Sequence, residues 1–302
     1  MSAPVPEFAV DASSQDGLRP PWWVRLLATC PLPMLHAFAS TLALIAGRIA
    51  SYRASMIRAS LALAFPTRSA LEREQVRQDF YRGYADVMVE IIKSASMTGD
   101  ELDRRMRLTN LEVMRAPMRE GSPVLLLAAH QCNWEWILLA LSRQLGFPVD
   151  AAYKPLHNPW ADRAMLALRS RFGARMVPAE RVMRDVIARR RVPRLIAFVA
   201  DQEPVASDRR HWTRFLNRDT AFYMGGEVLV NSLGYPAFFV AIRRVARGHY
   251  EATFEPLWVP GEPLQPGELT ERYARRVERQ IHEAPAHWPW SHKRWRLRRE
   301  TP

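Results

Sequence analysis

The stretch Val124-Leu-Leu-Leu-Ala-Ala-His130-Gln-Cys-Asn-Trp-Glu135 decides the fold of this chain of 302 residues. It opens with a short apolar run that follows Gly121-Ser122-Pro123 and ends in a polar turn, a pattern that predicts a buried strand. The turn opens a predicted helix over residues 134–144, which Gly146 ends. His130 and Glu135 are therefore expected at the carboxyl end of a strand, where open α/β sheets keep their sites.

The rest of the chain alternates predicted strands with predicted helices. Apolar or alternating runs predict strands at 149–153, 195–200, 237–243 and 250–256. Helical spacing of apolar residues, or length and end signals, predicts helices at 69–93, 100–106, 159–172, 181–190, 226–232 and 269–284. Such alternation implies an α/β fold with a mainly parallel central sheet flanked by helices.

The charge balance narrows the class of partner. Lys and Arg number 43 against 31 Asp and Glu, a net charge of +12. This excess of positive charge favours an anionic partner: a membrane surface, an acidic carrier protein, a phosphorylated substrate or nucleic acid. The alternative is that the arginines serve only solubility, which would give the same composition. The chain shows no nucleic-acid motif, and its aromatic residues do not interleave with basic ones, so nucleic acid is not expected.

The amino-terminal part divides into two segments. Residues 1–21 are rich in Pro, Ser, Ala and Asp and are expected to be disordered. Residues 26–47 carry no charge over almost a membrane-spanning length, but two prolines interrupt them. Three interpretations are open for 22–60: a transmembrane anchor, a helix in the membrane interface, or a buried helical hairpin. The basic flank that follows predicts a cytoplasmic catalytic domain over 61–302.

The pair His130 and Glu135 suits general-base chemistry. A carboxylate beside an imidazole can fix its tautomer and stabilise its cation, and the reaction then needs no metal and no Ser or Cys nucleophile. The spacing alone is weak evidence for a catalytic pair, because His157 and Asp162 have the same spacing in a segment expected to be a loop that runs into a helix. Only the predicted strand before His130 distinguishes the first pair from the second. Cys132 leaves a thiol nucleophile open, with a buried bystander as the alternative.

Several blocks of sequence resemble one family. His130-Gln-Cys-Asn-Trp-Glu135 resembles the first signature of the late lipid A acyltransferases, the lauroyl and myristoyl transferases of lipopolysaccharide synthesis, within the His-x-x-x-x-Asp/Glu glycerolipid acyltransferase superfamily. Similar blocks follow the family order at 61–66, 169–173, 200–202, 215–218 with Gly225, and 290–295. Asn217 stands where a Gly is common in the family, a departure that bears on the acceptor rather than on the chemistry.

The resemblance implies a reaction and its site. It implies acyl transfer from an acyl carrier protein thioester to a hydroxyl of a lipid A precursor, at the cytoplasmic face of a bacterial inner membrane and without metal or redox cofactor. The alternative is O- or N-acyl transfer to a lysophospholipid, an aminolipid or a lipid-linked pigment. The catalytic residues would be His130 and Glu135, and the residues expected to bind substrate are Asn133, Trp134, Arg169, Arg171, Asp201, Gln202 and Arg218.

Each of these residues also has a purely structural interpretation. Asn133 can cap the following helix, and Trp134 can pack in the core. The two arginines can bind a phosphate bidentately or lie on a solvated helix face, and Asp201 can serve only the strand end. Two further classes stay open: a hydrolase with Cys132 as nucleophile, and a basic membrane- or nucleic-acid-binding module.

Overall fold

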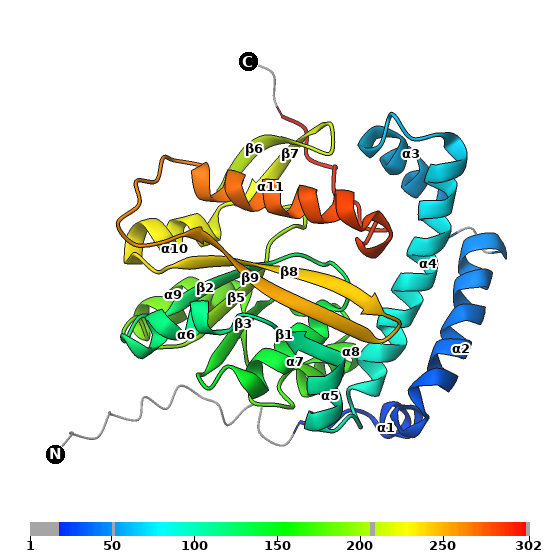
Figure 1. Ribbon diagram of the computed structural model, residues 1–302, viewed down its shortest axis with the longest axis horizontal. Coiled ribbons are helices and arrows are strands. Elements are labelled where there is room, and N and C mark those ends of the chain that lie inside the picture. The colour runs from blue at the N-terminus through cyan, green and yellow to red at the C-terminus, as the bar shows by residue number, and fades with distance from the viewer. Residues whose placement is uncertain (1–17, 50–51, 206–208, 300–302) are drawn as a thin grey trace.

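A computed structural model describes residues 18–49, 52–205 and 209–299 (Figure 1). The disorder expected for residues 1–21 lies outside these ranges for residues 1–17. Figure 1 shows a central sheet between two layers of helices, with α4 (Ala70–Lys93) standing across one end of the strands. The α/β class expected from the sequence is confirmed.

In the described residues the central sheet has seven strands in the order β1-β9-β8-β2-β5-β3-β4. Neighbouring strands pair in parallel, except that β8 and β9 pair antiparallel. The strands are β1 (Met106–Leu108), β2 (Val124–Ala128), β3 (Val149–Tyr153), β4 (Arg175–Pro178), β5 (Leu195–Val199), β8 (Ala237–Ala246) and β9 (His249–Trp258). The sheet is thus mostly parallel, as the alternation of strands and helices predicts.

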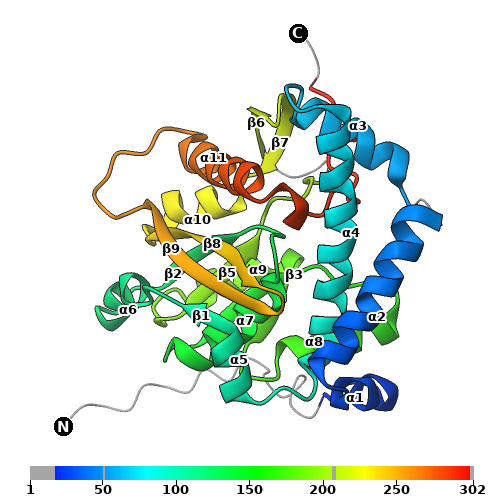
Figure 2. The same cartoon turned by 45° about the vertical axis from the view of Figure 1, so that its right-hand side comes forward.

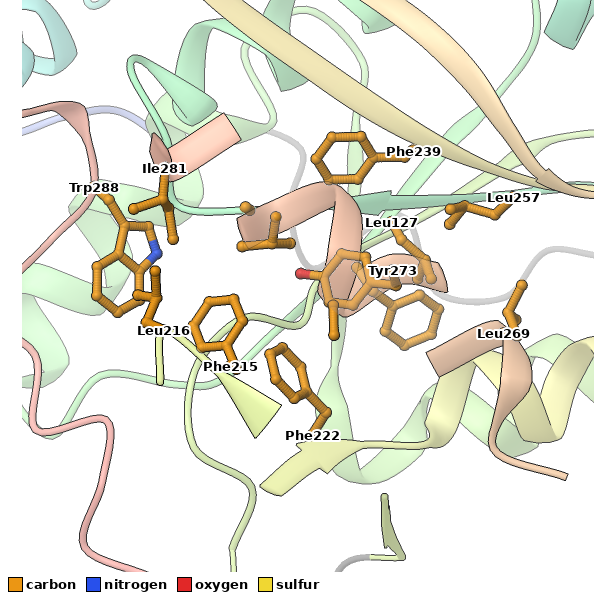
Figure 3. Close-up of a cluster of buried hydrophobic side chains, with 14 of the residues drawn as sticks. Leu127, Phe215, Leu216, Phe222, Phe239, Leu257, Leu269, Tyr273, Ile281 and Trp288 are labelled. Atoms are coloured by element: carbon orange, nitrogen blue, oxygen red, sulfur yellow. The ribbon is translucent and has the colours of Figure 1, made fainter. Parts of the chain in front are cut away.

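The two faces of the sheet bury different helices. Leu125 and Leu127 of β2 pack with α9 (Val182–Ala188), α10 (Gly225–Leu233) and α11 (Glu268–Glu283), the core seen in Figure 3. Leu126 packs on the other face with α5 (Gly99–Arg105), α6 (Glu112–Arg119) and α7 (Trp134–Gln144). Since side chains alternate between faces, a strand covered on both sides must be apolar throughout. This is why β2 shows no alternation of apolar and polar residues.

The helix α4 begins as its sequence predicts. The Ser69 side chain accepts a hydrogen bond from the backbone N–H of Glu72, and the Glu72 carboxylate accepts one from the backbone N–H of Ser69. Such reciprocal caps satisfy two backbone donors that a helix start leaves free. Elsewhere the predicted ends are less exact: α8 (Pro159–Arg169) stops short of residue 172, where it was expected to end.

The hairpin of β6 (Arg210–Phe215) and β7 (Arg218–Tyr223) is not predicted from the sequence. Its strands mix Arg, Asp and Thr with aromatic residues, so they show neither an apolar run nor a regular alternation. The turn residues Leu216 and Asn217 have positive φ angles of 49° and 63°. Asn tolerates this left-handed region better than most residues, which accounts for Asn217 in a place where Gly is common.

Helices α1 (Trp22–Thr29) and α2 (Leu32–Leu44) lie outside α4 (Figure 2). No single described helix is long and apolar enough to cross a membrane, and the pair that passes together on length and composition is bent by 109°. One face is packed, because His36 Nε2 lies 2.9 Å from Glu90 Oε1 and Lys93 Nζ donates to the carbonyl of Ala28. The outer face exposes the apolar side chains of Trp22, Leu26, Met34, Phe38 and Leu44.

Candidate active site

His130 lies in the turn after β2 and contacts the residue pair that follows β5. Its Nδ1 is 2.6 Å from Oδ1 of Asp201, and its backbone N–H donates to Oδ2 of the same carboxylate at 3.1 Å. Strands β2 and β5 are parallel neighbours, with Ala128 beside Val199. Because the carboxyl ends of the two strands lie side by side at the same end of the sheet, residues 71 positions apart in the chain become hydrogen-bonded neighbours.

The carboxylate that holds the imidazole is therefore Asp201, whereas the sequence predicted Glu135. Both carboxylate oxygens of Glu135 accept hydrogen bonds from Arg169, at 2.8 Å and 2.5 Å, and Oε1 also accepts from the indole N–H of Trp134. Glu135 lies in the first turn of α7, and its side chain reaches across to the end of α8, where Arg169 is the last residue. The expected pairing of His130 with Glu135 is corrected accordingly.

Asp201 is buried, yet it is held in its charged form. Burial by itself would raise the pKa of Asp201, but the charge of His130 and the hydrogen bonds from His130 and Trp288 outweigh it and leave that pKa below its usual value. An ionised Asp201 accepts a hydrogen bond from a protonated Nδ1, so Nε2 is the unprotonated nitrogen of the imidazole. Gln202 places its amide nitrogen 3.2 Å from Nε2, which suits a donor facing an unprotonated ring nitrogen.

Glu135 and Arg169 form a buried ion pair beside the imidazole. Burial would raise the pKa of Glu135, but the charge and hydrogen bonds of Arg169 outweigh it and leave that pKa below its usual value. The Glu135 side chain is 8% exposed and that of Arg169 is 22% exposed. Removal of either side chain would therefore leave the charge of the other poorly solvated and unpaired. The pair ties the start of α7 to the end of α8.

A pocket of about 450 Å³ opens beside His130. Its roof is one face of α7, formed by Trp134, Ile137, Leu138 and Leu141. Its floor includes Ala128, Ala151 and Ala197, which come from the three adjacent strands β2, β3 and β5. Small side chains on neighbouring strands leave room between the sheet and the helix, so the pocket suits a long apolar group whose polar end lies at the imidazole.

Four of the residues expected to bind substrate or to catalyse line this pocket with His130, namely Trp134, Glu135, Arg169 and Gln202. Asn133 does not line the pocket, and the residue is fully buried. Its side-chain oxygen accepts from the backbone N–H of Trp136, and its amide donates to Glu90 at 2.8 Å. The capping interpretation of Asn133 is thus confirmed, and substrate binding by its side chain is corrected.

Arg171 and Arg218 lie away from the pocket beside His130. Arg171 donates to the backbone carbonyls of Ser94 and Met97 and lines a second cavity, at the amino-terminal ends of β3 and β4. The expected joint binding of a phosphate by Arg169 and Arg171 is therefore wrong, since the two side chains point to different partners. Substrate binding by Arg171 alone stays a prediction. The guanidinium of Arg218 stacks over the ring of Trp295, 4.4 Å from its centroid, and its role toward substrate stays a prediction.

The structure also decides the role of Cys132. The residue is 2% exposed, burial raises the pKa of its thiol to about 12, and the thiol donates to the backbone carbonyl of Ile242. A nucleophilic cysteine must be accessible and partly ionised, so Cys132 is a buried bystander. No group of three or more His, Cys, Asp or Glu in the described residues is arranged to hold a metal ion.

One contributor to the site escaped the sequence reasoning. The indole N–H of Trp288 donates to Oδ2 of Asp201 at 2.8 Å. The only signal was indirect, since the family-like block at 290–295 begins two residues later. A tryptophan without a motif of its own cannot be assigned to a distant carboxylate until the carboxyl-terminal segment is placed.

An imidazole backed by a buried carboxylate at an apolar pocket defines an enzyme that can deprotonate a group on or beside a long apolar substrate. Comparison with known proteins names the reaction class. The sequence profile of the bacterial lipid A biosynthesis acyltransferases matches residues 22–297. The chain belongs to this family and is an acyltransferase.

Two relatives illustrate the breadth of the match. The chain is 24% identical over 194 residues to a lipid A biosynthesis acyltransferase of Haemophilus influenzae, covering 62% of this chain and 61% of that protein. It is 22% identical over 278 residues to the lipid A biosynthesis palmitoleoyltransferase of Escherichia coli, covering 91% of this chain and 88% of that protein. The match thus spans less than two thirds of the first relative and most of the second.

Proposed function

We propose that this enzyme transfers a fatty acyl chain from an acyl carrier protein thioester to a hydroxyl of a lipid A precursor. Family membership supports the reaction class and the lipid acceptor. The observation that carries the residue-level proposal is the hydrogen bond between His130 and Asp201 at the mouth of the apolar pocket. In this proposal Asp201 takes the role that the sequence alone suggested for Glu135.

The chemistry follows from the orientation of the imidazole. Nδ1 of His130 keeps its proton and donates a hydrogen bond to Asp201, and Nε2 accepts the proton of the acceptor hydroxyl while the oxygen of that hydroxyl attacks the thioester carbonyl. A carbon–oxygen bond forms, the carbon–sulfur bond breaks, and the imidazolium returns its proton to the departing thiolate. A thioester is already activated, so no acyl-enzyme intermediate is needed. General-base assistance of this kind contributes roughly a hundred- to ten-thousand-fold in rate.

The apolar pocket suits the acyl chain of the donor. Trp134 stands near His130, and Leu141 lies seven residues further along the same face of α7, so the chain would run under the helix away from the imidazole. We expect Ala197→Leu, which adds a bulky side chain to the floor, to shift use toward shorter acyl donors. Competition between acyl carrier protein thioesters of different length measures this shift, and an unchanged preference would argue against this pocket as the acyl site.

The exposed apolar face of α1 and α2 supports contact with the membrane interface. Trp23 of α1 stacks on Trp160 at 5.2 Å between ring centroids, and Trp160 is exposed. Leu156, four residues before Trp160 in the chain, is exposed and lines the pocket. An apolar surface therefore extends from α1 toward the mouth, where a lipid acceptor could enter without leaving the interface. The net charge of +12 favours an anionic, cytoplasmic leaflet of the inner membrane.

Vesicle binding tests this orientation. We expect Phe38→Glu and Trp22→Glu to lower co-sedimentation with vesicles that contain anionic phospholipid. Val113→Glu is the matched control, because Val113 is an exposed apolar residue of α6, on the opposite side of the molecule from α2 (Figure 1). Equal binding by all three variants would contradict docking through α1 and α2.

The acyl donor is proposed to be a carrier protein rather than a free thioester. Lys154 is exposed at the pocket mouth, and the chain as a whole is strongly basic, which suits an acidic donor protein. A transfer assay with the same acyl group on acyl carrier protein and on coenzyme A distinguishes the two donors. We expect the carrier-bound substrate to react faster, with an advantage that shrinks at high salt.

Lipid mass spectrometry of a deletion strain tests the acceptor. We expect lipid A to lose one secondary acyl chain, to regain it with the wild-type gene, and not to regain it with His130→Ala. Complementation with Cys132→Ser is the control and should succeed, because that thiol is buried. An unchanged lipid A together with a changed phospholipid, aminolipid or pigment would favour the alternative acceptor.

A further inference from the structure

The carboxyl-terminal segment that follows α11 brings Trp288 beneath the imidazole site. Trp288 is 2% exposed and follows a short 3-10 turn, Pro285–His287. Its ring packs edge-on against Phe215, Trp290 and Trp295, at centroid distances of 6.3, 4.9 and 6.0 Å. Figure 3 shows the indole near Leu216 and Phe215 at one end of the buried cluster. These three aromatic neighbours hold the indole N–H in one direction.

That direction is toward Asp201. Oδ2 of the carboxylate accepts from Trp288 Nε1 at 2.8 Å and from the backbone N–H of His130 at 3.1 Å. Oδ1 faces Nδ1 of His130 at 2.6 Å. A carboxylate that turns about its own axis would lose both Oδ2 bonds, so the two donors fix the oxygen that meets the imidazole.

The same segment holds the turn that carries His130. The backbone carbonyl of His287 accepts a hydrogen bond from the backbone N–H of Cys132 at 3.0 Å, and Cys132 has a positive φ of 53°. Positive φ is unfavourable for a residue with a side chain, so the turn needs such external support. Residues 287 and 288 therefore contact both members of the pair, His130 through its turn and Asp201 through its side chain.

We propose that Trp288 is a positioning residue of the acyl transfer, whose indole N–H keeps Asp201 Oδ1 on His130 Nδ1 so that Nε2 faces the pocket. The inference rests on the proposed function, since it takes His130 as the base. Trp288 acts through Asp201 and does not touch the reacting atoms. Supporting residues of this kind matter because a base must be held within a fraction of an ångström and a few tens of degrees of its working orientation.

Other charged or titratable groups also face Asp201. They are His130, His292, Tyr273 and Arg294. Burial lowers the pKa of Arg294 to about 10 and lowers that of His292 below its ordinary value. At neutral pH and below, Arg294 is therefore charged in wild type and variant alike, so it does not contribute to the acidic limb of the pH profile.

The first experiment compares Trp288→Phe with Trp290→Phe. Both variants remove one buried indole from the same segment, but the indole N–H of Trp290 donates to the carbonyl of Pro285 instead of the site. For Trp288→Phe we expect kcat to fall about 10- to 100-fold, the loss typical of removing a hydrogen bond to a charged group, with KM within about twofold. Trp290→Phe keeps an aromatic ring against Trp288 and should retain kcat, and equal losses in the two variants would overturn the proposal.

The second experiment removes only the donor. Replacing Trp288 by β-(3-benzothienyl)alanine keeps the shape of the ring and substitutes sulfur for the N–H, which avoids a variant that merely fails to fold. We expect the same fall in kcat. The acidic limb of the kcat profile should move to higher pH, because a carboxylate that has lost a donor lets the pair with His130 take up a proton more readily. Wild-type kcat and an unmoved limb would refute the positioning role.

His130→Ala separates this inference from the proposed function. If His130→Ala remains active, the general-base mechanism itself fails. If His130→Ala is inactive while both replacements of Trp288 behave as wild type, only the positioning role of Trp288 fails. Melting temperatures of all variants show whether any loss of rate reflects unfolding.

Discussion

Glu135 and Asp201 are two buried carboxylates near one imidazole, and they differ in every partner. Glu135 is five residues from His130 in the chain, yet it binds Arg169. Asp201 is 71 residues away and binds His130 directly. Both have a pKa below the usual value, one because of an arginine and the other because of the histidine and the indole of Trp288. Nearness in sequence therefore does not identify the partner; the register of two parallel strands does.

The difference has a simple geometric origin. Neighbouring parallel strands finish at the same end of a sheet, so the turns that follow β2 and β5 lie next to each other. Glu135 already belongs to α7, and the direction of a helical side chain is set by its place on the helix surface. That direction leads to the end of α8. The two carboxylates thus belong to different structural units, a strand-end pair and a helix-to-helix tie.

The strongest challenge to this comparison is Asp201→Asn. We expect kcat to fall on the order of a thousand-fold, because an amide can donate to Nδ1 and so favours the tautomer with the proton on Nε2, which cannot act as the base. Initial rates of acyl transfer at saturating substrate measure the effect. A larger fall in kcat for Glu135→Gln than for Asp201→Asn would restore the pairing expected from the sequence.

Glu135→Gln and Arg169→Met address stability rather than proton transfer. Each should lower the free energy of unfolding by roughly 3 kcal/mol, because it leaves one charge buried without its partner, and the 22% exposure of Arg169 places the value at the low end of the usual range. The double variant should lose less than the sum. Urea titration of the four proteins gives the coupling energy, and strict additivity would show that the ion pair is not formed.

Acid should act on both carboxylates in the same direction. Their folded-state pKa values lie below the usual ones, so each contributes its full stabilisation above the ordinary carboxyl pKa of about 4, and that stabilisation is lost as pH falls below it. We expect the melting temperature of the wild type to drop more steeply between about pH 5 and pH 3 than that of the Glu135→Gln, Asp201→Asn double variant. Parallel curves would contradict the two lowered pKa values.

Cys132→Ala provides a smaller effect in the same turn. We expect kcat within about twofold of the wild type and a loss of roughly 1 kcal/mol in stability, since the buried thiol is replaced by a smaller apolar side chain. Alkylation should also leave the native enzyme active, because the thiol is inaccessible. A loss of kcat comparable with that of Asp201→Asn would instead revive the thiol nucleophile.

The smallest effect is expected for the second pair with the same spacing. His157 is exposed, and Asp162 accepts a hydrogen bond from the backbone N–H of Leu156, a contact that shapes the loop before α8. His157→Ala should therefore leave kcat within about twofold of the wild type. Because His157 lines the pocket mouth, a slight change in KM is the most that we expect. A loss in kcat comparable with that of His130→Ala would mean that the spacing itself, and not the strand end, carries the activity.

Much of the fold was predictable because its signals are local. The apolar run of β2, the capping box of α4 and the alternation of strands with helices all depend on residues within a few positions of one another. The short strands β1 and β4 and the hairpin of β6 and β7 were missed, because strands of three or four residues show no period and the hairpin strands are largely polar.

Within the site, predictability depended on the same distinction. His130 could be singled out because the strand before it and the helix after it are visible in one stretch of sequence. The cap formed by Asn133 is equally local. The separation of Arg169 from Arg171 was not predictable, because two residues at the end of a helix point in directions that depend on where the helix stops.

The amino-acid sequence by itself determined the fold class, the family resemblance and the position of His130, because these rest on patterns along the chain. Only the tertiary structure decided that Asp201 holds the imidazole, that Glu135 serves Arg169, and that Trp288 reaches the same carboxylate. Hydrogen bonds depend on distances of about 3 Å and on direction, and distances between residues far apart in the chain exist only once strands and helices have packed.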